Sequence, residues 1–167
     1  MKTSVSILGI GLLALSGCHR APSEPTGPTA VTATSQGVVV SQARLVLPAV
    51  RGNPGAAYFT VSNQNGVPAT LVRVDVAGAQ NTEIHETSGG TMQSLARIRI
   101  DPGQQVIFAP AGKHCMVFSL APALVPGGTG KIVLHFQDGT AISAPLRIEA
   151  AGGDMAGMAG MDMGGKP

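Results

Sequence analysis

Residues 69–78 have the sequence ATLVRVDVAG, in which apolar and charged side chains alternate. Arg73 and Asp75 each stand between two valines, and this period of two is typical of a half-buried β-strand. Eight further segments are rich in β-branched, aromatic or other apolar residues and predict strands as well. They are VVVSQARLVL (38–47), AAYFTVSN (56–63), NTEIHET (81–87), TMQSLARIRI (91–100), QQVIFA (104–109), KHCMVFSL (113–120), KIVLHFQD (131–138) and AISAPLRIEA (141–150).

Glycine, proline and asparagine mark the connections between these segments. The predicted turns are Asn53-Pro54-Gly55, Asn65-Gly66, Asp101-Pro102-Gly103, Pro126-Gly127-Gly128 and Asp138-Gly139. No stretch of about 11 residues shows the period of a helix. Eight or nine strands in about 115 residues therefore predict an all-β Greek-key sandwich, with a barrel as the alternative.

The N-terminus predicts export and lipidation. Lys2 is followed by the apolar run SVSILGIGLLALSG, which is too short to span a bilayer and fits a signal peptide. Leu15-Ser16-Gly17-Cys18 resembles a bacterial lipobox. We therefore expect residues 1–17 to be a lipoprotein signal peptide and Cys18 to be acylated, which anchors a protein stably. An ordinary secretory signal is the alternative, and His19, in place of aspartate, favours the outer membrane.

The composition divides the rest of the chain into three parts. Residues 18–36 are rich in Pro, Ser, Thr and Ala and predict a flexible tether after the lipidated cysteine. Residues 37–150 form the predicted domain, and residues 151–167 predict a disordered, Met-rich tail. The formal net charge of +2 and the absence of Trp argue against a nucleic-acid partner. Acylation of Cys18 leaves Cys115 without an intramolecular disulfide partner, so the core must hold the domain.

Methionine is sparse in the predicted strands and occurs near histidine. The four side chains have the spacing His85-x6-Met92-x21-His114-x-Met116. A strand directs His114 and Met116 to one face and Cys115 to the other. Ser88-Gly89-Gly90 predicts a hairpin turn that brings the strand of His85 against the strand of Met92. Two imidazoles and two thioethers form an N₂S₂ set suited to Cu(I).

Thioethers suit a metal site outside the cytoplasm, because they need no deprotonation and do not form disulfides. Two other interpretations stay open, since a histidine on a strand is often a structural residue and an H-x-M pair has little specificity. We expect His135 to be a structural or supporting residue and not a ligand.

The sequence resembles the periplasmic Cu(A) chaperone (PCuAC) family over residues 37–150, whose signature is H-x10-M-x21-H-x-M. The residues that carry the resemblance are Ala57-Tyr58-Phe59, Asn63, Glu83-Ile84-His85, Asp101-Pro102-Gly103, Pro110-Ala111-Gly112 and Phe136-Gln137-Asp138-Gly139. Met92-x21-His114-x-Met116 matches the family spacing, whereas only six residues separate His85 from Met92. If the hairpin has lost four residues at its turn, the side-chain facing is preserved, because that number is even.

The resemblance implies a cupredoxin-like sandwich that binds Cu(I) through His85, Met92, His114 and Met116. It implies a monomeric, non-enzymatic chaperone on the periplasmic side of the envelope that passes copper to the copper-site subunit of cytochrome c oxidase or to another copper chaperone. Family members with Met-rich extensions suggest that the tail binds accessory copper. The tail residues are Met155, Met158, Met161 and Met163, with Asp154 and Asp162 as oxygen ligands for Cu(II).

Three other functions remain as alternatives. The first is copper storage or resistance in the periplasm. The second is an electron-transfer cupredoxin, which needs a cysteine thiolate beside two histidines and a methionine; no histidine follows Cys115 until His135. The third is a structural envelope lipoprotein without a metal. Enzyme chemistry has little support, because the chain has no G-x-S-x-G or H-E-x-x-H motif.

Overall fold

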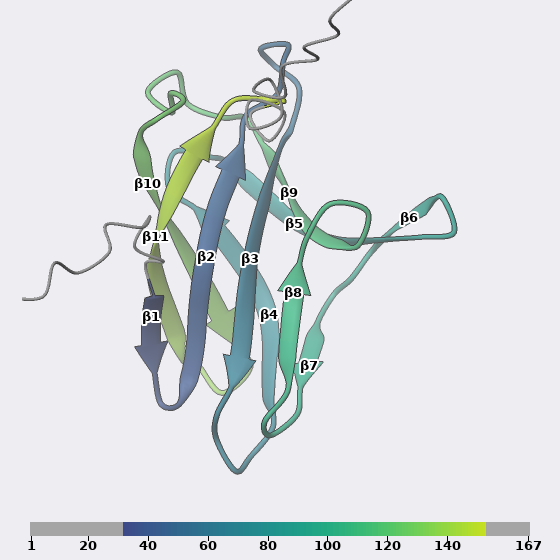
Figure 1. Ribbon diagram of the computed structural model, residues 1–167, viewed down its shortest axis with the longest axis vertical. Coiled ribbons are helices and arrows are strands. Elements are labelled where there is room, and N and C mark those ends of the chain that lie inside the picture. Colours follow the sequence, from purple (N-terminus) through teal and green to yellow (C-terminus); the bar gives the residue numbers. More distant parts are fainter. Residues whose placement is uncertain (1–31, 153–167) are drawn as a thin grey trace, which may run out of the picture.

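The computed structural model describes residues 32–152, which form eleven β-strands and no helix (Figure 1). The strands are β1 (Thr32–Ser35), β2 (Val38–Val46), β3 (Gly55–Asn63), β4 (Ala69–Val76), β5 (Asn81–Ser88), β6 (Thr91–Ser94), β7 (Ile98–Ile100), β8 (Gln105–Phe108), β9 (Lys113–Phe118), β10 (Thr129–Phe136) and β11 (Ala141–Glu149). The all-β prediction is confirmed. Within residues 32–152, no helical segment is long and apolar enough to cross a membrane.

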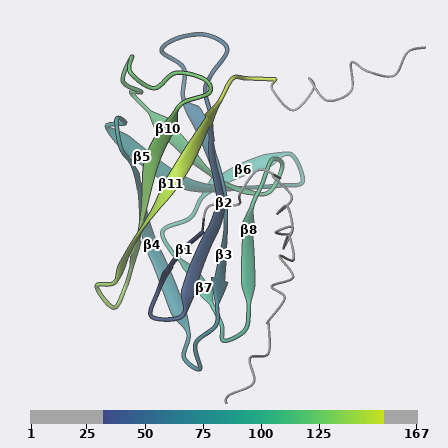
Figure 2. The same cartoon turned by 60° about the vertical axis from the view of Figure 1, so that its left-hand side comes forward.

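The strands form one continuous hydrogen-bonded sheet that curls over itself. Neighbouring strands follow the order β6-β5-β9-β8-β3-β2-β11-β10-β4-β7, and β1 pairs with β2. Figures 1 and 2 show β2, β3 and β8 on one side of the core and β4, β5 and β10 on the other. The architecture is thus a curled half-barrel, and the predicted sandwich of eight or nine strands in two sheets is not confirmed.

The predicted strand of residues 91–100 is two strands, because its halves join opposite ends of the sheet. β6 pairs with β5, whereas β7 pairs with β4. Residues 95–97 alone connect them, and a connection of this length spans about 14 Å at most. The end of β6 and the start of β7 therefore lie within this distance, although the two strands do not pair with each other.

The N-terminal boundary of the domain also differs from the prediction. Thr32–Ser35, the end of the predicted tether, form β1 and pair with residues 38–41 of β2. Gln36 and Gly37 between them have φ values of 46° and 73°, as the two-residue turn of a tight hairpin requires. Cys18, the signal peptide, the rest of the tether and residues 153–167 lie outside the described residues.

The core is built from the alternating inward-facing side chains of the strands. In β2 the pairing with β3 shifts between Ser41 and Arg44, and Gln42 there has a φ of 56°. This bulge changes which residues face inward, from Val40 before it to Ala43 after it, and both are buried. A strand that begins as three consecutive valines thus keeps one buried face along its whole length.

Asn63 holds together the connections at one end of the sheet. Its side chain is buried, and its Nδ2 donates to the carbonyl oxygens of Val67 at 2.8 Å and Ile100 at 2.9 Å. Its Oδ1 accepts a hydrogen bond from the backbone N–H of Asn65 at 3.0 Å. One amide therefore satisfies a carbonyl and an N–H of the loop after β3 and the carbonyl of the last residue of β7.

We predict that Asn63→Ala lowers the free energy of unfolding by about 3 kcal/mol, because it leaves buried polar groups without partners. Urea unfolding followed by circular dichroism measures the change. Ser62→Ala is the matched control: its hydroxyl accepts a bond from the exposed Gln105 side chain, so we expect a loss below about 0.5 kcal/mol. Equal effects of the two substitutions would contradict the role assigned to Asn63.

Candidate metal centre

His85 and His114 face each other across two neighbouring strands. In the antiparallel pairing of β5 with β9, His85 is directly opposite His114, and their ring centres are 6.0 Å apart with planes inclined by 26°. His114 is buried and the His85 side chain is 14% exposed. Two imidazoles so close, with so little exposure, form the centre of the candidate site.

The residues beneath the two histidines explain why the rings point outward. Ile84 and Cys115 are also directly opposite each other in the β5–β9 pairing. Both are buried members of the core. Because successive side chains of a strand point to opposite faces, burying Ile84 and Cys115 directs both histidines to the other face.

The two predicted methionine ligands share this outer face. Met116 is opposite Glu83, two residues from the histidine pair along both strands. Met92 on β6 is opposite Thr87, two residues beyond His85 in the other direction. The pleat therefore places all four predicted ligands on one face of the β6-β5-β9 ribbon, with the methionines on either side of the histidine pair.

The hairpin between His85 and Met92 has the shortest common form. Ser88 pairs with Thr91, and Gly89 and Gly90 between them have φ values of 58° and 79°. Positive φ at both central residues defines the two-residue turn that matches the twist of a hairpin, and glycine adopts it without strain. The six residues between His85 and Met92 are thus accounted for by a tight turn that retains the facing of both side chains.

Each imidazole has one nitrogen held by a hydrogen bond. His114 Nδ1 lies 2.9 Å from the carbonyl oxygen of Gly112; since a carbonyl only accepts, Nδ1 carries the proton. His85 Nε2 lies 3.1 Å from Glu83 Oε2 and donates to that carboxylate. The neutral rings therefore present His114 Nε2 and His85 Nδ1 as lone-pair nitrogens.

His85 Nδ1 is buried and has no hydrogen-bond partner, and it is the one such side-chain atom in the described part of the chain. An unsatisfied buried nitrogen is costly unless something else binds it. Metal–imidazole bonds are about 2 Å long, so rings that share one ion have centres roughly 6 Å apart. The distance between the rings and the orphaned lone pair fit a metal ion held by His85 and His114.

Glu83 is the residue that sequence reasoning did not assign to the site. Its Oε1 accepts a hydrogen bond from Asn81 Nδ2 at 3.1 Å while Oε2 accepts from His85. A carboxylate behind a metal-binding histidine fixes its tautomer and ring orientation. The spacing Glu83-x-His85 carries this signal, because it places both side chains on one face of a strand.

Cys115 is separated from the candidate ligands. It is fully buried, and burial raises the pKa of its thiol well above the usual range. Among residues 32–152, no three His, Cys, Asp or Glu side chains form a group able to hold a metal. A site built from described residues therefore depends on the methionine thioethers as well as on the two histidines.

His135, the third histidine within the described residues, lies on a different strand pair. It pairs with Arg73 of β4, and its Nε2 is 2.8 Å from Asp75 Oδ2. Asp75 also forms an ion pair with Arg73 at 2.9 Å. These contacts give His135 a structural role. Cys18, Met155, Met158, Met161 and Met163 lie outside the described residues.

The described domain matches one protein-family model. The family model described as "Putative lipoprotein LpqE-like" matches residues 38–148. No curated protein matches the chain.

Several solved structures have the same fold. The copper-bound PCuAC domain from PmoF2 is 18% identical with a TM-score of 0.62, over 71% of this chain and 97% of that domain. The apo PCuAC domain from PmoF1 is 21% identical with a TM-score of 0.62, over 71% and 98% of the two chains. The Cu(I) form of DR1885 from Deinococcus radiodurans is 24% identical with a TM-score of 0.54, over 74% and 83%. At these identities the likeness concerns the fold.

We predict that native Cys115 reacts with iodoacetamide at pH 8 at least about 100-fold more slowly than in the urea-unfolded chain, because the thiolate is the reactive form and burial disfavours it. Mass spectrometry of the alkylated peptide measures the rate. Cys115→Val is expected to leave Cu(I) affinity unchanged within about threefold, because the thiol faces the core. A larger loss of affinity would make Cys115 a ligand.

Proposed function

The chain belongs to the LpqE-like family, and from this membership and the His85–His114 pair we propose that it is a copper-binding chaperone of the bacterial envelope. The lipoprotein description of the family and the lipobox at Cys18 support an envelope location, on the periplasmic side of the outer membrane. The shared fold with copper-bound PCuAC domains supports the choice of metal.

One observation carries the proposal. His85 and His114 are paired with their ring centres 6.0 Å apart, and the free nitrogen of His85 is buried without a partner. Met92 and Met116 stand on the same face, on either side of this pair. Imidazoles and thioethers without a thiolate or a carboxylate ligand favour monovalent copper over harder divalent ions.

The same ligand set supports transfer of the ion by ligand exchange. Met92 is 53% exposed on the terminal strand β6, so it is the ligand that an incoming group reaches first. Thiolates of an acceptor bind Cu(I) more tightly than neutral thioethers do. They replace Met92 and then Met116, while the histidines, held by Glu83 and Gly112, keep the ion in place until the acceptor has bound it.

The acceptor we propose is the copper site of cytochrome c oxidase or another copper chaperone, as the PCuAC resemblance implies. Copper storage is the second candidate, and the four methionines of residues 153–167 favour it. The electron-transfer alternative loses its support, since the thiol of Cys115 faces the core on the side opposite His114.

We predict that His114→Ala lowers Cu(I) affinity at least about 100-fold in a chain ending at residue 150, because it removes a primary ligand. Competitive titration against a Cu(I) chelator measures the affinity. Because the tail is absent, its methionines do not contribute to the measured Cu(I) binding. His135→Ala is the matched control and should change affinity less than about threefold. Full affinity in His114→Ala would refute the site.

A second prediction separates the role of Glu83 from that of a general negative charge. Glu83→Ala is expected to lower Cu(I) affinity about tenfold, because His85 loses the acceptor that fixes its tautomer. Glu83→Gln retains an acceptor oxygen and should stay within about threefold of the unmodified protein. Glu86, which pairs with Lys113, supplies the control: Glu86→Ala leaves affinity unchanged if position matters, and lowers it equally if only charge does.

A further inference from the structure

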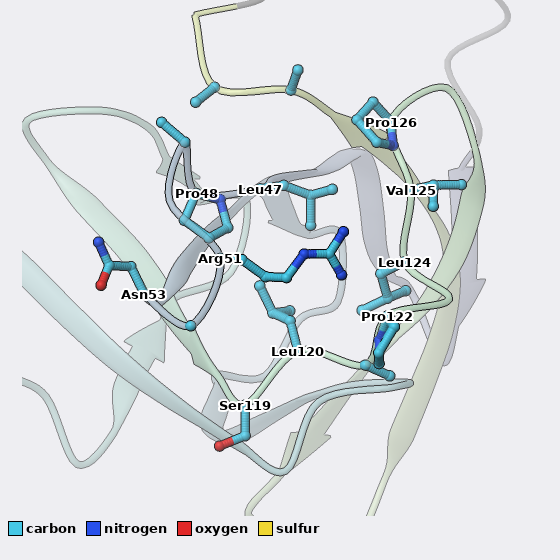
Figure 3. Close-up of a pocket in the computed structure, with 15 residues that line it drawn as sticks. Leu47, Pro48, Arg51, Asn53, Ser119, Leu120, Pro122, Leu124, Val125 and Pro126 are labelled. Carbon is cyan, nitrogen blue, oxygen red and sulfur yellow. The ribbon is translucent and has the colours of Figure 1, made fainter.

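A largely apolar cavity of about 430 Å³ opens at the end of the sheet where the described chain ends. Its walls are the β2–β3 connection, the β9–β10 connection and the residues after β11. The apolar lining includes Leu47, Leu120, Leu124, Val125 and Pro126 (Figure 3). Its volume falls within the range of about 300–1,000 Å³ that is usual for ligand pockets.

Backbone hydrogen bonds between these segments form the cavity in advance. Leu47 N–H donates to the carbonyl oxygen of Glu149, and Gly127 N–H donates to that of Ile148. Ala121 N–H donates to the carbonyl oxygen of Gly78. The walls are therefore held by the sheet, and an occupant does not have to order them.

The cavity combines exposed apolar surface with one free cation. Val125 in its wall is 53% exposed. Arg51 extends its guanidinium into the cavity toward Leu124 (Figure 3). Within residues 32–152 it forms no ion pair or hydrogen bond. An occupant that fits is apolar and carries a carboxylate.

We propose that this cavity is the docking site of the chain's own segment 154–161, DMAGMAGM. The connection is direct, because Ala150 and Ala151 line the cavity and the segment begins three residues later. A stretch of that length spans about 10 Å, so Asp154 and Met155 reach the cavity without crossing the molecule. This proposal does not depend on copper binding.

The pattern of the segment matches the cavity. Met155, Met158 and Met161 recur every third residue, with Ala-Gly between them. In an extended chain with three residues per turn, these side chains share one side. Alanine and glycine let the backbone approach the walls closely, methionine adapts to an irregular apolar surface, and Asp154 supplies the carboxylate for Arg51.

Methionine oxidation in the copper-free full chain, kept in chelator, tests the docking. With hydrogen peroxide and peptide mass spectrometry, we expect Met155 and Met158 to oxidise about fivefold more slowly than Met163, because docking covers their sulfur atoms. Val125→Asp should abolish the difference, since it places a charge in the apolar wall. The far-UV circular dichroism spectrum, compared with that of the unmodified chain, verifies that this variant remains folded. Equal rates for Met155, Met158 and Met163 in the unmodified chain overturn the proposal.

Charge exchange tests the proposed contact between Asp154 and Arg51. Arg51→Glu should raise the oxidation rates of Met155 and Met158, and the double variant Arg51→Glu/Asp154→Arg should restore protection. Arg97→Glu, an exposed arginine outside the cavity, is the matched control and should have no effect. If the double variant does not restore protection, the proposed contact between Asp154 and Arg51 is wrong.

Diluting the protein distinguishes docking within one chain from docking of a second copy's segment. Protection that is independent of protein concentration supports docking within one chain. Protection that disappears on dilution assigns the cavity to a second copy's segment and overturns the proposal.

Nuclear Overhauser contacts between the Met155 or Met158 methyl and the Leu124 methyls are expected in the unmodified chain, and their absence also overturns the proposal.

Discussion

The register between β5 and β9 is the constraint on which the candidate site depends. Ile84 and Cys115 must both face the core, and their pairing sets His85 opposite His114 on the outer face. A slip of one residue would bury one histidine and expose an apolar side chain in its place. The hydrophobic effect that holds the core together thus also sets the distance between the two imidazoles.

The same register decides which nitrogens are available. Glu83 is two residues before His85, and Gly112 is two residues before His114, so both acceptors lie beside the rings. These two hydrogen bonds orient the rings at little further cost in conformational entropy, because the strands already order the acceptors. The orientation of both imidazoles is therefore set by the folded chain.

Local sequence patterns predicted the strands and the facing of their side chains, because alternation is a property of each segment alone. Cys115 between His114 and Met116 is the clearest example. The division of residues 91–100 into β6 and β7 was not predictable, since it depends on which partner strand each half meets. β1 was also missed, because Thr32–Ser35 resemble the tether in composition and become a strand through pairing with β2. Glu83 was not assigned to the site although the local spacing Glu83-x-His85 carries its signal, whereas the cavity around Arg51 arises from contacts between distant segments that no local pattern encodes.

The strands that carry the candidate ligands differ in how many neighbours they pair with, and this number falls from β9 through β5 to β6. β9 pairs with β5, β8 and β3, whereas β5 pairs with β9 and β6, and β6 pairs with β5 alone. Exposure follows the same order, from 8% at His114 to 53% at Met92. Strands with fewer partners open at lower free energy. In the site we propose, one end of the ligand set is fixed to the core, and the other end is an exposed thioether on the strand with the fewest partners. The transfer that we propose requires that combination, which follows from the place of β6 at the end of the strand order.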